Sequence, residues 1–358
     1  MSLAAPATVF GASDDHTATE PPEYRGLARD EVRLLVASPG GVTHARFRDL
    51  PQHLRAGDLL VVNTSATLPA ELDGRRSGKP VVVHLATDLG DGAWVAELRS
   101  APGGTSPVLD ATAGDVIQLP ARARMRLVAP YPRPDSSPTG SGNRLWRVQL
   151  VRAVSDPAES ALAYLYRHGR PIAYGYLRHR FDLSDYQTIF ATHPGSAEMP
   201  SAARPFSHDL VTRLVTAGIP IAPITLHTGV SSQDVGEAPQ AEWYEVPAPT
   251  AGLVASTHRA GGRVIAVGTT VTRALESAVG GDGTIAASSG WTELVIDPCR
   301  GVRVVDGLIT GWHNPEASHL LLVEAVVGSA VTQRAYDGAV AEGYLWHEFG
   351  DVGLLLRR

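Results

Sequence analysis

Residues 262–277, GRVIAVGTTVTRALES, predict a β-strand that turns directly into an α-helix. The run 264–267 is short, apolar and rich in β-branched residues, with glycines on both sides, which is typical of a buried strand. Thr269 or Thr270 then offers an N-cap for a helix that continues through Glu276. A buried strand followed at once by a helix indicates an α/β fold.

The turn between this strand and helix is also a candidate binding site. A helix start leaves backbone N–H groups free above the sheet edge, where its dipole favours a carboxylate or a phosphate. We expect Gly268, Thr269 and Thr270 to supply these groups and Arg273, about one turn later, to add a bidentate contact. The alternative is an ordinary strand-turn-helix unit with a capping threonine and a solvated arginine.

The composition limits the classes of protein to consider. The chain has 358 residues, enough for about two domains, and its 44% hydrophobic content allows a sizeable core. A net charge of −6 argues against a broadly basic nucleic-acid-binding surface but leaves room for a local basic groove. The single cysteine, Cys299, excludes a disulfide framework and a cysteine-built zinc site. Without a long apolar run or a signal peptide, we expect a cytoplasmic protein with no membrane partner.

Two more predicted strands end in polar residues. The strand at 59–62 ends at Asn63-Thr64-Ser65, and the strand at 219–226 ends at His227-Thr228-Gly229. The carboxyl ends of buried strands are where α/β proteins tend to bind ligands. Together with Gly268-Thr269-Thr270, these residues predict a ligand site at one edge of the sheet.

The middle of the chain has a different pattern. From residue 72 to about 154, short β-branched runs alternate with Gly, Pro, Ser and Asp clusters, and no helical periodicity intervenes. Such spacing predicts a small β-barrel or sandwich. Residues 1–22 lack periodicity and are expected to form a flexible leader.

Other elements follow from capping and turn residues. A helix is expected from Asp156 to His168, and another begins at an N-cap, Ser207. Residues 302–310 are expected to form a hairpin that turns at Asp306-Gly307. Helices are expected at about 317–327 and 330–342.

Seven segments occur in a recognisable order: FRDLPQHLRAGDLLVVN, DYQTIFATHPGSAEMPSA, AEWYEVP, GRVIAVGTTVTRALES, SGWTELVIDP, VRVVDGLITGWHNPEASHLLLVEA and AYDGAVAEGYLWHEFGD. Together they resemble the S-adenosylmethionine:tRNA ribosyltransferase-isomerase family of queuosine biosynthesis, over about residues 25–355. The resemblance implies a discontinuous larger α/β domain, residues 23–71 and 155–358, with an inserted small β-barrel domain, residues 72–154.

The resemblance also implies a reaction. The family transfers and isomerises the ribosyl portion of S-adenosylmethionine onto the aminomethyl group of 7-aminomethyl-7-deazaguanine in tRNA, and releases adenine and methionine without a metal. S-adenosylmethionine is then the co-substrate, tRNA a possible partner, and no metal is expected. In the segments that carry the resemblance, His227, His313 and Glu242 are the expected proton carriers.

Other residues in these segments are expected to bind S-adenosylmethionine. Tyr244 and Glu245 pair an aromatic ring with a carboxylate, a combination that suits a purine or a sulfonium. Asn63 can hydrogen-bond a ribose or a base. The alternatives are a strand edge packed around Trp243, a strand terminated by Asn63, and structural histidines.

The chain departs from the family's pattern at several positions. After Asn63 it lacks an aspartate and two arginines, and Glu71 reverses one of those charges. Pro205 and Gln240 replace histidines, and Glu316 replaces a lysine. Fewer basic residues mean fewer phosphate contacts. Two alternatives therefore stay open beside the tRNA reaction: a diverged enzyme that acts on a small-molecule acceptor, and a protein that binds nucleosides or RNA without catalysis.

Overall fold

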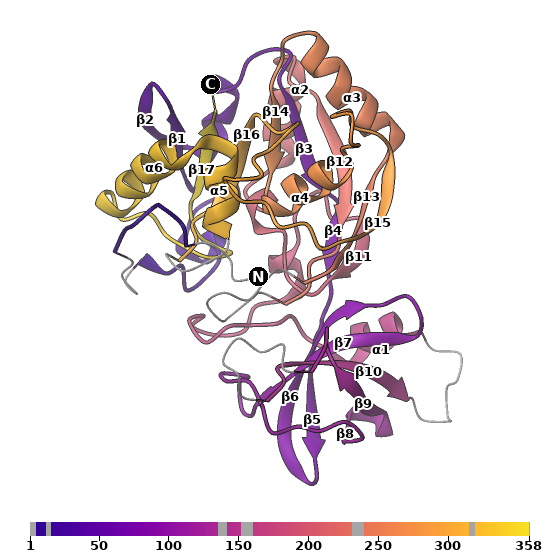
Figure 1. Cartoon of the computed structure of the whole chain (residues 1–358). Coiled ribbons are helices and arrows are strands. Elements are labelled where there is room, and N and C mark those ends of the chain that lie inside the picture. The colour runs from indigo at the N-terminus through magenta and orange to yellow at the C-terminus, as the bar shows by residue number, and fades with distance from the viewer. Residues whose placement is uncertain are drawn as a thin grey trace.

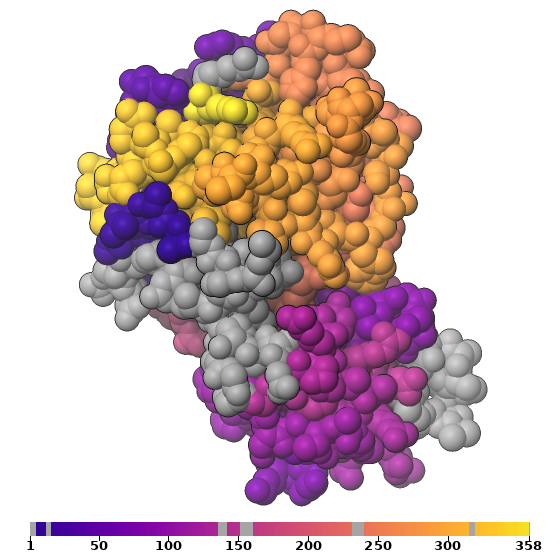
Figure 2. All heavy atoms as spheres, viewed as in Figure 1, coloured from indigo at the N-terminus to yellow at the C-terminus, as the bar shows by residue number. Residues whose placement is uncertain are grey.

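The computed structural model describes residues 5–11, 16–134, 142–151, 160–230, 240–314 and 319–357. It contains a nine-stranded sheet with helices on both faces and a closed barrel of six strands (Figure 1). The barrel forms a second lobe beside the larger α/β lobe (Figure 2). The predicted fold, an α/β architecture with an inserted β-barrel, is confirmed.

Four parallel strands form the centre of the large sheet, in the order β12 (Ile221–Leu226), β3 (Leu59–Asn63), β14 (Val264–Val267) and β16 (Gly307–Gly311). Every residue of β3 and β14 is buried, as their continuous apolar runs predict. The flanking strands are β13 (Glu242–Val246) and β15 (Ser288–Thr292) on one side, and β17 (Val352–Leu356), β1 (Arg33–Ser38) and β2 (Gly41–Arg46) on the other.

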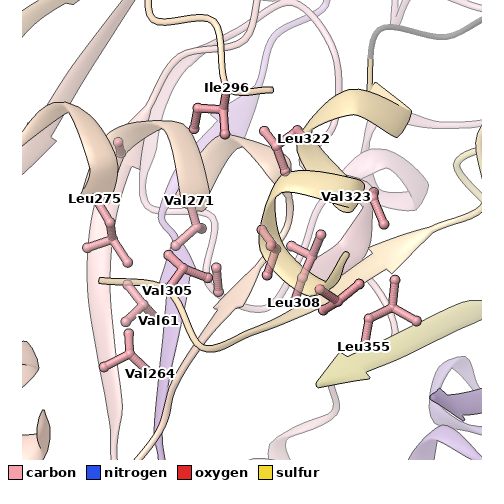
Figure 3. Close-up of a cluster of buried hydrophobic side chains, with 14 of the residues drawn as sticks. Val61, Val264, Val271, Leu275, Ile296, Val305, Leu308, Leu322, Val323 and Leu355 are labelled. Atoms are coloured by element: carbon pink, nitrogen blue, oxygen red, sulfur yellow. The ribbon is translucent and has the colours of Figure 1, made fainter. Parts of the chain in front are cut away.

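Helices cover both faces of this sheet. One apolar core joins the sheet to α3 (Ala248–Arg259), α4 (Thr269–Ser277), α5 (His319–Val327) and α6 (Ser329–Ala341). Figure 3 shows Val271 and Leu275 of α4 and Val323 of α5 packed over the strands. The core on the opposite face includes α2 (His208–Thr216), whose N-cap Ser207 accepts a hydrogen bond from Leu210 N–H, as predicted. The short 3₁₀ turns are η2 (Pro22–Arg25), η3 (Arg29–Glu31), η4 (Phe47–Gln52), η6 (Leu183–Tyr186) and η7 (Ser201–Ala203).

The barrel closes in the order β10-β7-β6-β5-β8-β9. Its elements are β5 (Glu71–Arg76), β6 (Lys79–Asp88), β7 (Ala93–Ser100), β8 (Val116–Gln118), η5 (Pro120–Arg122), β9 (Arg124–Pro130) and β10 (Leu145–Val151). Tyr164 and Leu165 of α1 (Ala161–His168) pack into the barrel core. Between the lobes, β4 (Ser65–Thr67) pairs with β11 (His193–Ser196). The domain extents 23–71 with 155–358, and 72–154, remain our proposal.

Two local predictions are wrong. Neither Thr269 nor Thr270 is the N-cap of α4: the cap is Gly268, whose φ of 103° suits glycine, and no side chain caps the helix. Residues 302–310 do not form a hairpin, because β16 instead pairs with β14 and β17. Asp306 lies at the buried start of β16, where its carboxylate accepts hydrogen bonds from Val264 N–H (3.0 Å) and His258 Nε2 (2.9 Å).

The described part of residues 1–22 packs against the large lobe instead of forming a flexible leader. Thr8 is buried, and its N–H and hydroxyl donate to Glu324 Oε1 at 2.7 and 2.6 Å. Phe10 stacks on Tyr336 with 4.6 Å between ring centroids. Residues 1–4 and 12–15, the predicted helix start at 156–159, and Glu316 lie outside the described residues.

A buried ion cluster joins the barrel to the segment that follows it. Glu71, at the start of β5, is fully buried, and its Oε1 accepts from Arg170 (2.7 Å) and Arg180 (2.6 Å). Its other oxygen lies 3.2 Å from His84 Nε2. Burial alone would raise the pKa of Glu71, but the hydrogen bonds from His84 and Arg180 outweigh it and hold that pKa at about 2. Glu71, the reversed charge in the sequence, is therefore neutralised by this chain's own arginines.

Candidate active site

A cavity of about 280 Å³ lies at the carboxyl ends of the four parallel strands. Its wall includes Thr228 and Gly229 after β12, Gly268, Thr269 and Thr270 after β14, and Thr310 and His313 at the end of β16. Consecutive parallel strands present their carboxyl ends at the same edge of a sheet, which is why segments far apart in sequence meet here. The sequence-predicted residues that line the cavity are Glu242, Gly268, Thr269, Thr270, Arg273 and His313.

The start of α4 supplies the positive end of the cavity. In this turn Thr272 N–H donates to Gly268 O (3.2 Å), so the N–H groups of residues 269–271 precede the first intrahelical hydrogen bond. Gly268 N–H is held by Ile309 O at 2.8 Å, which anchors the turn to the sheet. With no side-chain cap, this turn can offer backbone donors to an anion.

Arg273 and Glu242 form an ion pair in the wall of the cavity. Their side chains are 9% and 13% exposed, and Arg273 Nη1 donates to Glu242 Oε2. Arg273 also donates to the carbonyls of Leu294 (3.2 Å), Thr292 (3.2 Å) and Gln240 (3.3 Å). Burial raises the pKa of Glu242, and the charge of Arg273 opposes that effect. The guanidinium group is thus held by the protein itself, while its contact with a ligand stays a prediction.

Asn63 and His227 lie beside the cavity, outside its lining. Asn63 is fully buried; its Oδ1 accepts from Leu226 N–H and Ser65 N–H, both at 3.0 Å, and its Nδ2 donates to Leu226 O (2.8 Å). His227 Nδ1 lies 2.8 Å from Ser65 Oγ, and its ring stacks on Trp243 at 5.3 Å. Burial lowers the pKa of His227 to about 4, so the imidazole is neutral at pH 7. These contacts hold strand ends together, and roles toward a ligand remain predictions.

Tyr244 and Glu245 point away from the cavity. Tyr244 is 6% exposed and belongs to the core beneath α4, with its hydroxyl 2.8 Å from Ser288 Oγ. Glu245 is exposed, because successive residues of a strand face opposite sides. The structure therefore gives no contact that would support their predicted place in the S-adenosylmethionine site, and that role stays untested.

Three neutral histidines gather at the other side of the cavity. His313 stacks on His319 with 4.5 Å between centroids and 6° between planes, and its Nε2 lies 3.1 Å from Thr310 Oγ1. Burial is the main cause that lowers the pKa of His313 well below its ordinary value, and it lowers the pKa of His319 to about 4. Burial also lowers the pKa of His347. Only His313 of these was singled out from the sequence.

An acidic and aromatic wall completes the cavity, and no pattern in the sequence marks its members. Tyr174 O–H donates to Glu198 Oε1, and Tyr176 O–H donates to Glu348 Oε2. The two tyrosine rings stack with 5.9 Å between centroids, and Tyr176 stacks on His347 at 4.5 Å. All five residues line the cavity.

Three buried polar atoms of the lining have no hydrogen-bond partner among the described residues. They are Tyr186 Oη, Gln240 Oε1 and Trp312 Nε1. The side chains of Tyr186 and Trp312 are 3% and 1% exposed. Buried polar groups normally find a partner, so these three atoms mark an unusual polar part of the lining.

Within the described ranges, no group of three or more His, Cys, Asp and Glu side chains could hold a metal ion. The helices of the same ranges include none that is both long and apolar enough to cross a bilayer.

An uncapped helix start, neutral histidines and buried carboxylates at the carboxyl ends of parallel strands are features of an α/β enzyme that binds a small polar molecule. The family described as "Queuosine biosynthesis protein" matches residues 9–355. The chain belongs to this family.

Several relatives named S-adenosylmethionine:tRNA ribosyltransferase-isomerase are similar over nearly their whole length. The protein of Xanthobacter autotrophicus is 33% identical over 97% of both chains, and that of Methylocella silvestris is 37% identical over 91% of both. The protein of Thermus thermophilus is 36% identical over 96% of this chain and 99% of its own. The crystal structure of the S-adenosylmethionine tRNA ribosyltransferase from Thermotoga maritima is similar with a TM-score of 0.53 and 25% identity, over 97% of this chain and 99% of that chain.

Proposed function

We propose that this protein transfers and isomerises the ribosyl portion of S-adenosylmethionine onto the 7-aminomethyl-7-deazaguanine of tRNA, a step of queuosine biosynthesis. The observation that carries the proposal is the family match over residues 9–355, which spans the whole lining of the cavity. Because the proposed acceptor is tRNA, we place the reaction in the cytoplasm. The proposed reaction consumes S-adenosylmethionine as a substrate and uses no metal.

One end of the cavity suits the methionine carboxylate of S-adenosylmethionine. The start of α4 can bind its methionine carboxylate through backbone N–H groups and the helix dipole. Gly268, Thr269 and Thr270 are therefore our proposed carboxylate site, with Arg273 as a positive neighbour.

The reaction requires a base near the ribose C5′ and an acid near the departing adenine. His313 is neutral and lines the cavity, so it can accept a proton there. Glu242 lines the cavity too, where its carboxylate is paired with Arg273. We propose His313 and Glu242 as the proton carriers and keep His227, beside the lining, as a further candidate.

The outer face of the barrel supports an RNA acceptor. Arg75, Arg122, Arg124 and Arg126 are all exposed on neighbouring elements of this face. Arg75 and Arg124 both lie opposite Gln118, on β5 and β9 respectively, and thus share one side of the sheet. In a chain with a net charge of −6, this row is a local basic surface of the kind that contacts phosphates.

One assay tests the proposal. Purified protein is incubated with S-adenosylmethionine, with and without tRNA that carries the deazaguanine base, and adenine and methionine are quantified by chromatography. Release that requires this tRNA is the expected result. Release without tRNA, or only with a small amine, would replace the proposal with a small-molecule acceptor. Binding of S-adenosylmethionine without any release of adenine would indicate a protein that binds this ligand without catalysis.

A further inference from the structure

We infer that Glu198 and Glu348, with Tyr174 and Tyr176, form a subsite for a primary ammonium group carried on a flat heteroaromatic ring. The inference rests on the proposed function and deepens it, since it assigns the amine of the acceptor to one wall of the cavity.

Both carboxylates belong to one polar wall. Each accepts a hydrogen bond from one tyrosine, and the two tyrosine rings stack at 5.9 Å, which brings the two Tyr–Glu pairs side by side. Burial raises the pKa of Glu348 to about 7, and the negative charge of Glu198 adds to that effect. The two carboxylates therefore act on each other, and a cation between them would relieve their repulsion.

The chemistry of the wall favours an ammonium over a sulfonium. A primary ammonium has three N–H donors, whereas a sulfonium has none, and carboxylate oxygens bind most strongly to charged donors. The neighbouring His313, His319 and His347 have lowered pKa values and thus add no positive charge at pH 7. Arg273 is directed to Glu242 and three carbonyls.

Three residues of the lining carry polar groups that suit the rest of the proposed ligand. Tyr186 Oη, Gln240 Oε1 and Trp312 Nε1 offer a hydroxyl, an acceptor and a donor, respectively. The edge of a heteroaromatic base has ring N–H and carbonyl groups that complement them.

Calorimetric titration with two free bases tests the inference. One is 7-aminomethyl-7-deazaguanine, and the other is 7-methyl-7-deazaguanine, which lacks only the amine. The wild-type protein is expected to bind the amine about 10-fold or more tightly than the methyl compound, as a charge-assisted hydrogen bond implies. Glu348→Gln and Glu198→Gln should each remove most of this preference. Glu342→Gln, an exposed neighbour in sequence, should retain it.

A parallel titration with S-adenosylmethionine shows whether this wall binds the cation of the acceptor or that of S-adenosylmethionine. The affinity of Glu348→Gln for S-adenosylmethionine should change by less than about threefold. The inference is overturned if the wild-type protein shows no preference for the amine, if both glutamine variants keep it, or if they lose S-adenosylmethionine instead. A thermal melt of each variant confirms that it is folded. Binding is measured without turnover, so failure of the adenine-release assay would overturn the proposed reaction and leave this binding result intact.

Discussion

Replacing Arg273 by methionine is expected to destabilise the protein by about 3–5 kcal/mol, the usual cost of leaving one member of a buried ion pair alone. The methionine keeps most of the side-chain volume and removes every donor. Glu242, 13% exposed, would lose its cation, and the carbonyls of Leu294, Thr292 and Gln240 would each lose a hydrogen bond. A ligand contact alone would instead cost about 1.5–3 kcal/mol of binding and no stability.

Urea denaturation measures the stability, and calorimetry measures the affinity for S-adenosylmethionine. A double-mutant cycle with Glu242→Gln isolates the pair: the double variant should be more stable than Arg273→Met alone, with a coupling of about 1–3 kcal/mol. The reasoning fails if Arg273→Met loses less than about 1 kcal/mol of stability yet binds S-adenosylmethionine tenfold more weakly. Arg273 would then be the ligand clamp that its place in the sequence suggests.

Three other outcomes are expected. Burial raises the pKa of Glu348 from 4.5 to about 7, so its contribution to stability is full below pH 4.5 and is lost as the pH rises through 7. As the pH rises from 5 to 8, the free energy of unfolding of Glu348→Gln should therefore increase relative to that of the wild type, by about 3 kcal/mol at most. The double variant Arg124→Glu, Arg126→Glu should weaken tRNA binding in filter assays and reduce the slope of log affinity against log salt concentration by about one per lost phosphate contact. The control Arg213→Glu on α2 should do neither. Equal effects of the two variants would show that the barrel face does not contact RNA. A methyl group at Gly195 would overlap the His227 ring, whereas Gly252 in α3 has open space. Gly195→Ala should thus cost about 1–3 kcal/mol and Gly252→Ala gain up to about 1 kcal/mol, and a neutral Gly195→Ala would show that His227 is free to move.

The sequence predicts the position of the site better than the contacts within it. The apolar runs of β3, β12 and β14 and the polar residues after them were sufficient, because parallel strands must present their carboxyl ends together. The partner of Arg273 was not predictable, since Glu242 lies 31 residues earlier on an antiparallel strand. Strand β5, ELDGRR, has no β-branched run to mark it in the sequence, and its first residue, Glu71, is buried through its arginine partners.

The acidic wall shows a second limit of prediction from the sequence. Glu198 and Glu348 are far apart in the chain, and Tyr174 and Tyr176 lie in a stretch that forms no regular helix or strand. No periodic pattern marks such residues, and only the folded arrangement brings each carboxylate to its tyrosine. By contrast, His313 was selected because it lies in one of the segments that carry the family resemblance, and the structure places it in the lining of the cavity.

The ion cluster around Glu71 has a consequence for exchanging domains between relatives. A barrel cut out as residues 72–154 would leave behind Arg170 and Arg180 and would separate His84 from its carboxylate. In a chimera with a foreign barrel, these two arginines would then face a barrel surface that has no matching partners for them. The unit that can be moved intact is longer, from Glu71 through Arg180, because the last residues of that stretch neutralise its first.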